Sequence, residues 1–143
     1  MPSEEQIRGW VELAVGGAPL SSQRDIELAV RVVDADEIRT LNNLYRKQDT
    51  ATNVLSFPVG EVDGLPEHAT LVLGDVIICA SVVCTEAADQ GKSLADHWGH
   101  MLVHGTLHLL GYDHDTDAES LEMEALEVCL LATRGVTDPY GAT

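Results

Sequence analysis

The sequence predicts an α/β protein: a small mixed β-sheet of about four strands packed with about five helices, in one domain that spans residues 1–143. Three observations lead to this fold class. Segments with helical periodicity and segments with strand-like alternation are interspersed along the chain. No repeat, low-complexity tract or long linker divides the 143 residues. A chain of this length buries about two thirds or more of its unfolded surface, so one hydrophobic core is enough.

The first part of the chain contains two helix signals and one strand signal. Residues 3–16 begin with the Ser and Gln of a capping box and keep helical periodicity up to a Gly-Gly pair. In residues 26–32 the apolar side chains alternate with others, which is typical of a half-buried strand. Asp34 and Glu37 form a second capping pair, and the apolar spacing after them predicts a helix that ends near Arg46.

The rest of the chain predicts two strands and then three helices. The segments NVLSFPV and TLVLGDVIICA are apolar and β-branched, and a loop rich in Gly, Pro and acidic residues separates them. We interpret Asp75, in the second segment, as part of a turn or bulge in an edge strand. A helix follows from about Ser81 until residues 91–93 interrupt it, and a longer helix spans about residues 94–110. Gly111 ends that helix, and a last amphipathic helix closes the chain.

The chain is strongly acidic, with a formal net charge of −16 and only eight Lys and Arg residues. Such a field repels polyanions and argues against a non-specific nucleic-acid-binding protein. The basic residues are unevenly distributed, because five of them lie between residues 24 and 47 and only Arg134 follows His114. A local basic face can therefore exist on a negatively charged molecule.

Cysteine usage and the lack of long apolar runs indicate the compartment. Three cysteines are an odd number, and they lie in apolar segments that suit buried thiols better than disulfides. No apolar run approaches the roughly 20 residues needed to cross a bilayer. The stretch MPSEEQIRGW carries acidic residues where a signal peptide carries basic ones. We therefore expect a cytoplasmic protein without membrane association.

Three histidines fall in the stretch HGTLHLLGYDH, at positions 104, 108 and 114. On a helix His104 and His108 lie on one face about 6 Å apart, and Gly111 lets the chain reverse so that His114 can approach the same point. Three imidazoles with an open fourth position are the arrangement of a catalytic zinc site. The sequence therefore predicts one divalent metal, zinc or another, at the end of this central helix, where a bound water becomes a nucleophile near neutral pH.

Two further histidines and one acidic residue leave alternatives open. His100 could replace His108 as the partner of His104, but helical rise separates His100 from His108 by about 12 Å, so one metal cannot hold both. For His97 and His100 we expect contact with solvent or with groups that surround the ligands. Asp113 either orients a ligand histidine through the other ring nitrogen or caps the turn.

The same spacing matches the extended zinc-protease signature HExxHxxGxxH, with one difference. Gly105 stands where that signature places its glutamate general base. A metalloprotease would therefore need another acid to supply the base. This absence weighs against a protease that uses the same three histidines.

The histidine stretch resembles, nearly letter for letter, a segment of the YbeY family of bacterial endoribonucleases, also called rRNA maturation factors. The segments LNNLYRKQDTATNVLSFP, LGDVIIC and MEALE are similar to the same family in the same order, so the resemblance covers about residues 26–131. It implies a metal-dependent, single-strand-specific endoribonuclease that acts in 3′-end maturation of small-subunit ribosomal RNA and in ribosome quality control. Ala51, where proline is frequent, and Asn53, where aspartate is, are modest departures that remove no proposed catalytic group.

The resemblance also implies roles for individual residues. His104, His108 and His114 correspond to the metal ligands, and Arg46 corresponds to the family's functional arginine. We therefore predict that Arg46 and His114 are catalytic. A guanidinium can bind two phosphate oxygens with parallel hydrogen bonds, although the sequence alone equally allows Arg46 to complement the dipole of its helix.

Ser56 and Phe57 are predicted to line the substrate groove, with Phe57 either stacking on a base or belonging to the core. Three functions follow from these residues. The first is the metal-dependent endoribonuclease, the second is a zinc metalloprotease-like hydrolase, and the third is a ribosome assembly factor whose metal serves stability without cleavage. The expected partners are single-stranded RNA, rRNA, and the ribosome or a ribosomal protein.

Overall fold

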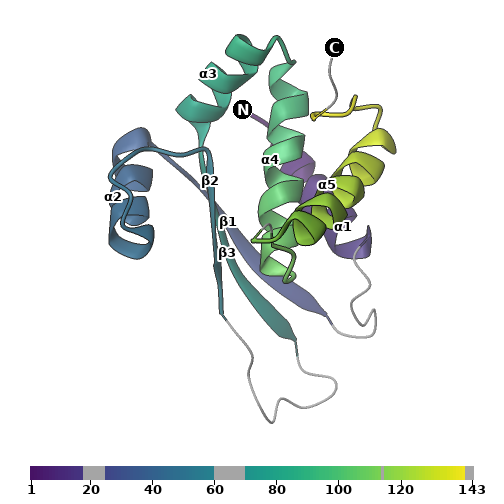
Figure 1. Ribbon diagram of the computed structural model, residues 1–143, viewed down its shortest axis with the longest axis horizontal. Coiled ribbons are helices and arrows are strands. Elements are labelled where there is room, and N and C mark those ends of the chain that lie inside the picture. The colour runs from purple at the N-terminus through teal and green to yellow at the C-terminus, as the bar shows by residue number, and fades with distance from the viewer. Residues whose placement is uncertain (18–24, 60–69, 114, 141–143) are drawn as a thin grey trace.

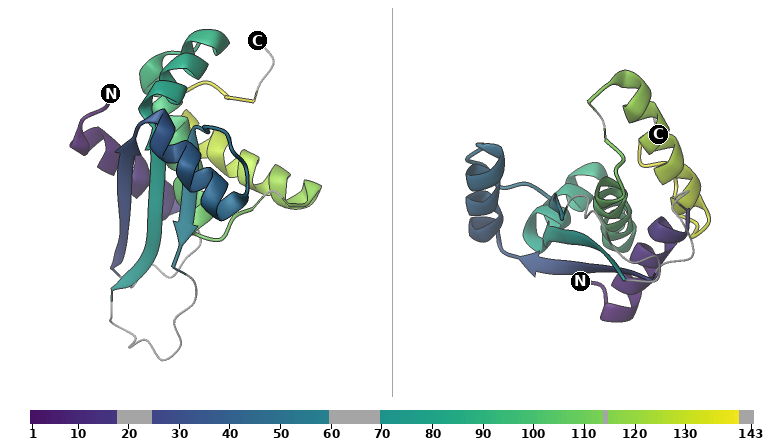
Figure 2. Two further views of the ribbon diagram at one scale, coloured as in Figure 1. Left: turned by 90° about the vertical axis from the view of Figure 1, so that its left-hand side faces the viewer. Right: turned by 90° about the horizontal axis from the view of Figure 1, so that it is seen from below.

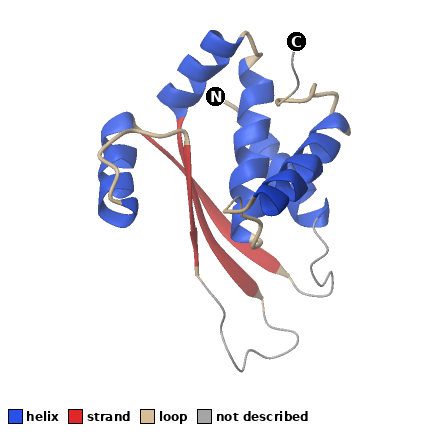
Figure 3. Ribbon diagram, viewed as in Figure 1, coloured by secondary structure: helices blue, strands red, loops and turns tan. Residues whose placement is uncertain are grey.

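The computed structural model describes residues 1–17, 25–59, 70–113 and 115–140, and this part of the chain forms an α/β fold (Figures 1 and 3). The elements in chain order are α1 (Glu4–Gly17), β1 (Ile26–Val33), α2 (Ala35–Arg46), β2 (Val54–Pro58), β3 (Leu71–Cys79), α3 (Ala80–Gln90), α4 (Leu94–Leu109) and α5 (Asp117–Ala132). The predicted fold class is confirmed. Within these described ranges the sheet has three strands, where about four were expected, because only three segments here have a strand pattern.

The three strands form one mixed sheet in the order β1-β3-β2. Strand β3 runs parallel to β1 and antiparallel to β2, so it is the central strand. The prediction that Asp75 lies in an edge strand is therefore wrong, since Asp75 pairs with Ala29 on one side and with Phe57 on the other. Asp75 itself is regularly paired, and the irregularity in this strand lies before it, where the register between β1 and β3 shifts between Glu27 and Leu28.

Helices cover both faces of this sheet (Figure 2). On one face Val76 and Ile78 of β3 pack with Trp98 of α4, and on the other face Ile77 of β3 packs with Ile38 of α2. Helix α4 also packs against α1 and α5, so it is the central helix of the fold. In the described ranges no helix is both long enough and apolar enough to cross a membrane.

Candidate metal centre and substrate groove

Helix α4 carries four histidines along its length. His97 and His100 are buried, with exposed fractions of 2% and 7%, whereas His104 and His108 near the end of the helix are partly exposed. The chain turns at Gly111, whose φ of 101° lies in the region that favours glycine, as the sequence predicts. The central helix therefore presents its last two histidines toward solvent and buries the first two.

The Nε2 atoms of His104 and His108 face each other at 3.1 Å. The Nδ1 atom of His108 lies 2.9 Å from the carbonyl oxygen of Tyr112, and that of His104 lies 2.5 Å from the carboxylate of Glu127. Both oxygens are acceptors, so each ring donates a hydrogen bond from Nδ1 and directs Nε2 at the other ring. Placed in this way, the two Nε2 atoms can bind one cation between them. Tetrahedral zinc with bonds of about 2.0–2.1 Å holds its donor atoms about 3.3 Å apart, which is close to the observed separation.

Glu127 of α5 is fully buried beside these histidines. Its Oε2 atom lies 3.0 Å from Nε2 of His100 and accepts a 2.5 Å hydrogen bond from the hydroxyl of Tyr140. Burial raises the pKa of Glu127, but hydrogen bonds from His100 and His104 outweigh it and lower that pKa to about 2. Burial and the neighbouring carboxylate raise the pKa of Tyr140, and burial lowers the pKa of His100. Glu127 is therefore an anion that accepts hydrogen bonds from three donors.

His100, His104 and Glu127 form a group that can hold a metal ion. Each offers one ligand atom, and these atoms lie within 4.8 Å of one another. The helix that the sequence singles out for metal binding therefore contains a candidate metal site. Its donor types, imidazole nitrogen and carboxylate oxygen, suit zinc and other divalent metals.

A groove of about 420 Å³ opens beside the facing imidazoles. It lies between the end of α4, strand β2 and the end of α2, where Arg46 is the last helical residue and is exposed. The predicted site residues that line it are Arg46, Ser56, His104, His108 and Asp113. The groove therefore brings a guanidinium and two imidazoles from distant parts of the chain to one surface.

Among the predicted site residues that the structure describes, Phe57 does not line this groove. Phe57 follows Ser56 in β2, so its side chain points to the opposite face of the sheet, where its ring packs edge-on against Tyr45 with a centroid distance of 5.1 Å. His114 lies outside the residues that the structure describes. Its roles as ligand and as catalytic residue stay predictions.

Gly105 lies where helix α4 packs closely against the sheet. A Cβ atom at this position would lie 2.8 Å from Cγ1 of Val76 and 3.0 Å from Cγ2 of Val54. The backbone carbonyl of Gly105 accepts a 2.8 Å hydrogen bond from Ser56. A glutamate here would collide with the sheet, so the position that a zinc protease uses for its general base serves helix–sheet packing in this fold.

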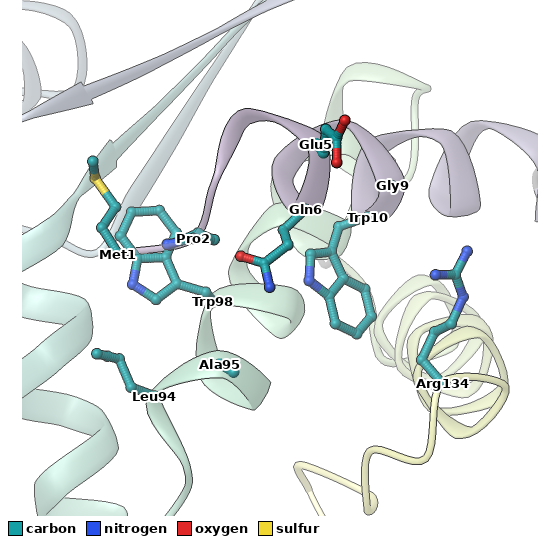
Figure 4. A pocket seen from close by; sticks show the side chains of 10 residues that line it. All are labelled: Met1, Pro2, Glu5, Gln6, Gly9, Trp10, Leu94, Ala95, Trp98 and Arg134. Carbon is teal, nitrogen blue, oxygen red and sulfur yellow. The ribbon is translucent and has the colours of Figure 1, made fainter.

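A second cavity, of about 710 Å³, lies between α1 and α4 (Figure 4). Trp10 and Trp98 contribute to its lining, and Glu5 and Arg134 are its charged residues. It contains no histidine or cysteine among its lining residues. The smaller groove beside His104 and His108 is therefore the candidate site for metal-dependent chemistry.

A small α/β fold with two facing histidine side chains beside an open groove defines a class of protein, a candidate metal-dependent hydrolase. Comparison with known proteins gives the family. The family model described as "Endoribonuclease YbeY" matches residues 2–135. The chain belongs to this YbeY family of endoribonucleases, as the resemblance of its motifs predicts.

Individual relatives agree with this family. The chain is 52% identical over 139 residues to a protein named endoribonuclease YbeY from Halorhodospira halophila, which covers 97% of this chain and 88% of the relative. It is 44% identical over 140 residues to the protein of the same name from Colwellia psychrerythraea, and this match covers 98% of this chain and 88% of the relative. The solution structure of TM1509 from Thermotoga maritima superimposes with a TM-score of 0.58 at 26% identity and covers 96% of this chain and 91% of that one.

Proposed function

We propose that this chain is a metal-dependent endoribonuclease that cleaves single-stranded RNA in the groove between α2, β2 and α4. Its relatives are named endoribonucleases, and the family role is in rRNA maturation. The observation that carries the proposal is the pair of facing Nε2 atoms of His104 and His108, 3.1 Å apart, beside a groove that Arg46 also lines. We assign one zinc ion, or another divalent metal, to His104 and His108 together with His114.

The distances favour His108 over Glu127 as the ligand that shares a metal with His104. Two ligand atoms of one tetrahedral zinc lie about 3.3 Å apart. The separation of His104 Nδ1 from Glu127 Oε1 is only 2.5 Å, which fits a short charge-assisted hydrogen bond. The Nε2 side of His104 also faces the groove, whereas Glu127 is fully buried.

The residues of the groove supply separate parts of the proposed reaction. A bound divalent metal acts as a Lewis acid and lowers the pKa of a coordinated water. Arg46 is exposed and lines the groove, so its guanidinium can pair with two phosphate oxygens on which negative charge develops. The attacking group is a water molecule or the 2′-hydroxyl of the RNA.

The acidic surface of the molecule makes partners part of the proposal. A net charge of −16 repels free RNA, so a basic ribosomal protein, or rRNA presented by the ribosome, would favour productive encounter. We therefore propose that the chain acts in the cytoplasm on the 3′ end of small-subunit rRNA and in ribosome quality control.

The test combines metal content with RNA cleavage. Elemental analysis of purified wild-type protein should find one divalent metal per chain, and a chelator should abolish cleavage of a single-stranded RNA. His108→Ala should lose the metal, because two ligands are too few for tight binding. His100→Ala should retain it. Loss of metal in His100→Ala with retention in His108→Ala would place the ion on the His100/His104/Glu127 group instead.

Arg46 is tested by single-turnover cleavage with metal-loaded protein. Arg46→Ala should lower the cleavage rate on the order of 10²-fold or more, as expected for loss of one preorganised donor. Arg46→Lys should recover only part of this loss, because an ammonium cannot reproduce the bidentate fork. The matched control is Arg39→Ala, which removes an exposed arginine on the same helix that pairs with Asp49 outside the groove. Equal rates for all four proteins would assign Arg46 to the helix terminus alone. Metal-loaded wild-type protein that cleaves no RNA would leave the assembly-factor function.

A further inference from the structure

Glu127 is a buried anion whose neighbours are unusual for a carboxylate. Its exposed fraction is 0%, and its ion-pair partners in the described part of the chain are His100 and His104, with no Lys or Arg among them. Burying a charge is costly unless it is paired and hydrogen-bonded. Within the described residues, hydrogen bonds from the two imidazoles and from Tyr140 are therefore what stabilise the buried charge of Glu127.

The hydrogen bonds of Glu127 fix both of its oxygen atoms. Oε1 accepts from Nδ1 of His104, and Oε2 accepts from the hydroxyl of Tyr140 and from Nε2 of His100. The donors come from α4 and from the chain after α5, so the carboxylate is held from two directions. His100 directs Nε2 to this cluster, where it also lies 3.0 Å from the hydroxyl of Tyr140, while its buried Nδ1 has no hydrogen-bond partner in the described part of the chain.

This geometry determines which nitrogen of His104 can bind a metal. A proton on Nδ1 directed at a carboxylate leaves the lone pair on Nε2, and the negative charge behind the ring makes that lone pair a stronger donor. The Nε2 atom is the one that faces His108 at 3.1 Å. Without Glu127 the ring of His104 could exchange tautomers and rotate away.

We propose that Glu127 is a positioning residue, which holds His104 in the tautomer and orientation that bind the metal, and that Tyr140 and His100 hold Glu127 in place. The inference rests on the proposed metal site at His104 and His108 and adds residues from α5 and the C-terminal segment to it. Glu127 acts through His104 and does not contact the metal. The chain near Tyr140 is thereby coupled to the groove, although it is not part of the groove lining.

The experiment measures metal affinity separately from activity. Zinc affinity is determined by competition with a chromophoric chelator for wild type, Glu127→Gln, Tyr140→Phe and the double variant, and the visible absorption of the Co²⁺-substituted proteins reports ligand geometry. Glu127→Gln should weaken zinc binding about 10- to 100-fold, with one zinc per chain still bound at saturation. Tyr140→Phe should weaken it less. Because Tyr140 acts through Glu127, the double variant should bind zinc no more weakly than Glu127→Gln.

Glu122→Gln is the matched control, because it removes an exposed carboxylate on the same helix, and its zinc affinity should equal that of wild type. Unchanged affinity in Glu127→Gln would overturn the inference. So would a complete loss of zinc and of the tetrahedral Co²⁺ spectrum, because that is the behaviour of a direct ligand. If Glu127→Gln does not fold, the zinc affinity of Tyr140→Phe is the test, because Tyr140 is 44% exposed and the variant keeps its ring. Weaker zinc binding in Tyr140→Phe would then support the inference, and unchanged binding would overturn it. Wild-type protein that binds zinc but does not cleave RNA would overturn the proposed function. The zinc affinities of the variants would still test the role of Glu127, because they do not depend on cleavage.

Discussion

Replacing Gly105 with alanine tests how closely helix α4 must approach the sheet to place its histidines. The new Cβ would lie 2.8 Å from Cγ1 of Val76 and 3.0 Å from Cγ2 of Val54. Optimal carbon–carbon contacts are about 3.5–4.0 Å long. Both valines are β-branched residues of neighbouring strands, so their methyl groups have little freedom to move away. The helix itself must shift, and it carries His104 with it.

Two opposing contributions set the change in the free energy of unfolding that Gly105→Ala should cause. Overpacking of a dense core costs about 1–3 kcal/mol, whereas alanine is favoured over glycine in a helix interior by about 1 kcal/mol. Gly105→Ala should therefore lower the free energy of unfolding by about 0–2 kcal/mol. Gly9→Ala is the matched control in α1, because nothing lies within 4 Å of the Cβ it would add, and it should raise stability by up to about 1 kcal/mol. The two variants should thus differ by about 1–3 kcal/mol, which is the cost of the close contact alone.

The assay is urea unfolding of both variants and of wild type, with zinc and with a chelator, together with zinc affinity. Gly105→Ala should also bind zinc more weakly than wild type, because the displaced helix moves His104 relative to its ligand partners. If Gly105→Ala is as stable as Gly9→Ala, the packing argument is refuted. The structural objection to a protease glutamate at this position would then disappear as well.

Two further predictions concern acid stability and the central strand. In chelator-treated protein the free energy of unfolding should fall as the pH drops below 6.5, because the pKa of His100 is lowered in the folded protein and the unfolded chain therefore binds this proton first. It should fall further between pH 4.5 and 2, because the carboxyl group of Glu127 is protonated in the unfolded chain before it is protonated in the folded protein, where its pKa is about 2. Circular dichroism at a series of pH values checks this. Glu127→Gln should show a smaller fall in the lower range, where Asp49, whose pKa Arg39 lowers, still contributes. Gly74→Ala should cost more than about 3 kcal/mol in urea unfolding, because φ is 136° and the added Cβ would lie 2.1 Å from the backbone oxygen of Phe57. A loss below about 1 kcal/mol would contradict it.

The sequence predicts the helices well because their signals are local. The helix expected over residues 34–46 is α2 (Ala35–Arg46), and Asp34 caps it by accepting a hydrogen bond from the backbone N–H of Glu37. The order of the strands depends on pairing between distant segments, and for this reason the edge position expected for the strand of Asp75 is wrong. A signal was present, since residues 76–79 are all apolar and all buried, which is typical of a strand covered on both faces.

The spacing of four residues on a helix brings His104 and His108 together, and this part of the site follows from the sequence. Glu127 lies 23 residues after His104, on another helix, so no periodicity connects them; the resemblance of the MEALE segment, which ends at Glu127, was the available signal. A metal ligand needs both a nitrogen in the right place and a proton on the other nitrogen. The first condition is local and can be read from the chain, whereas the second depends on how α5 packs against α4.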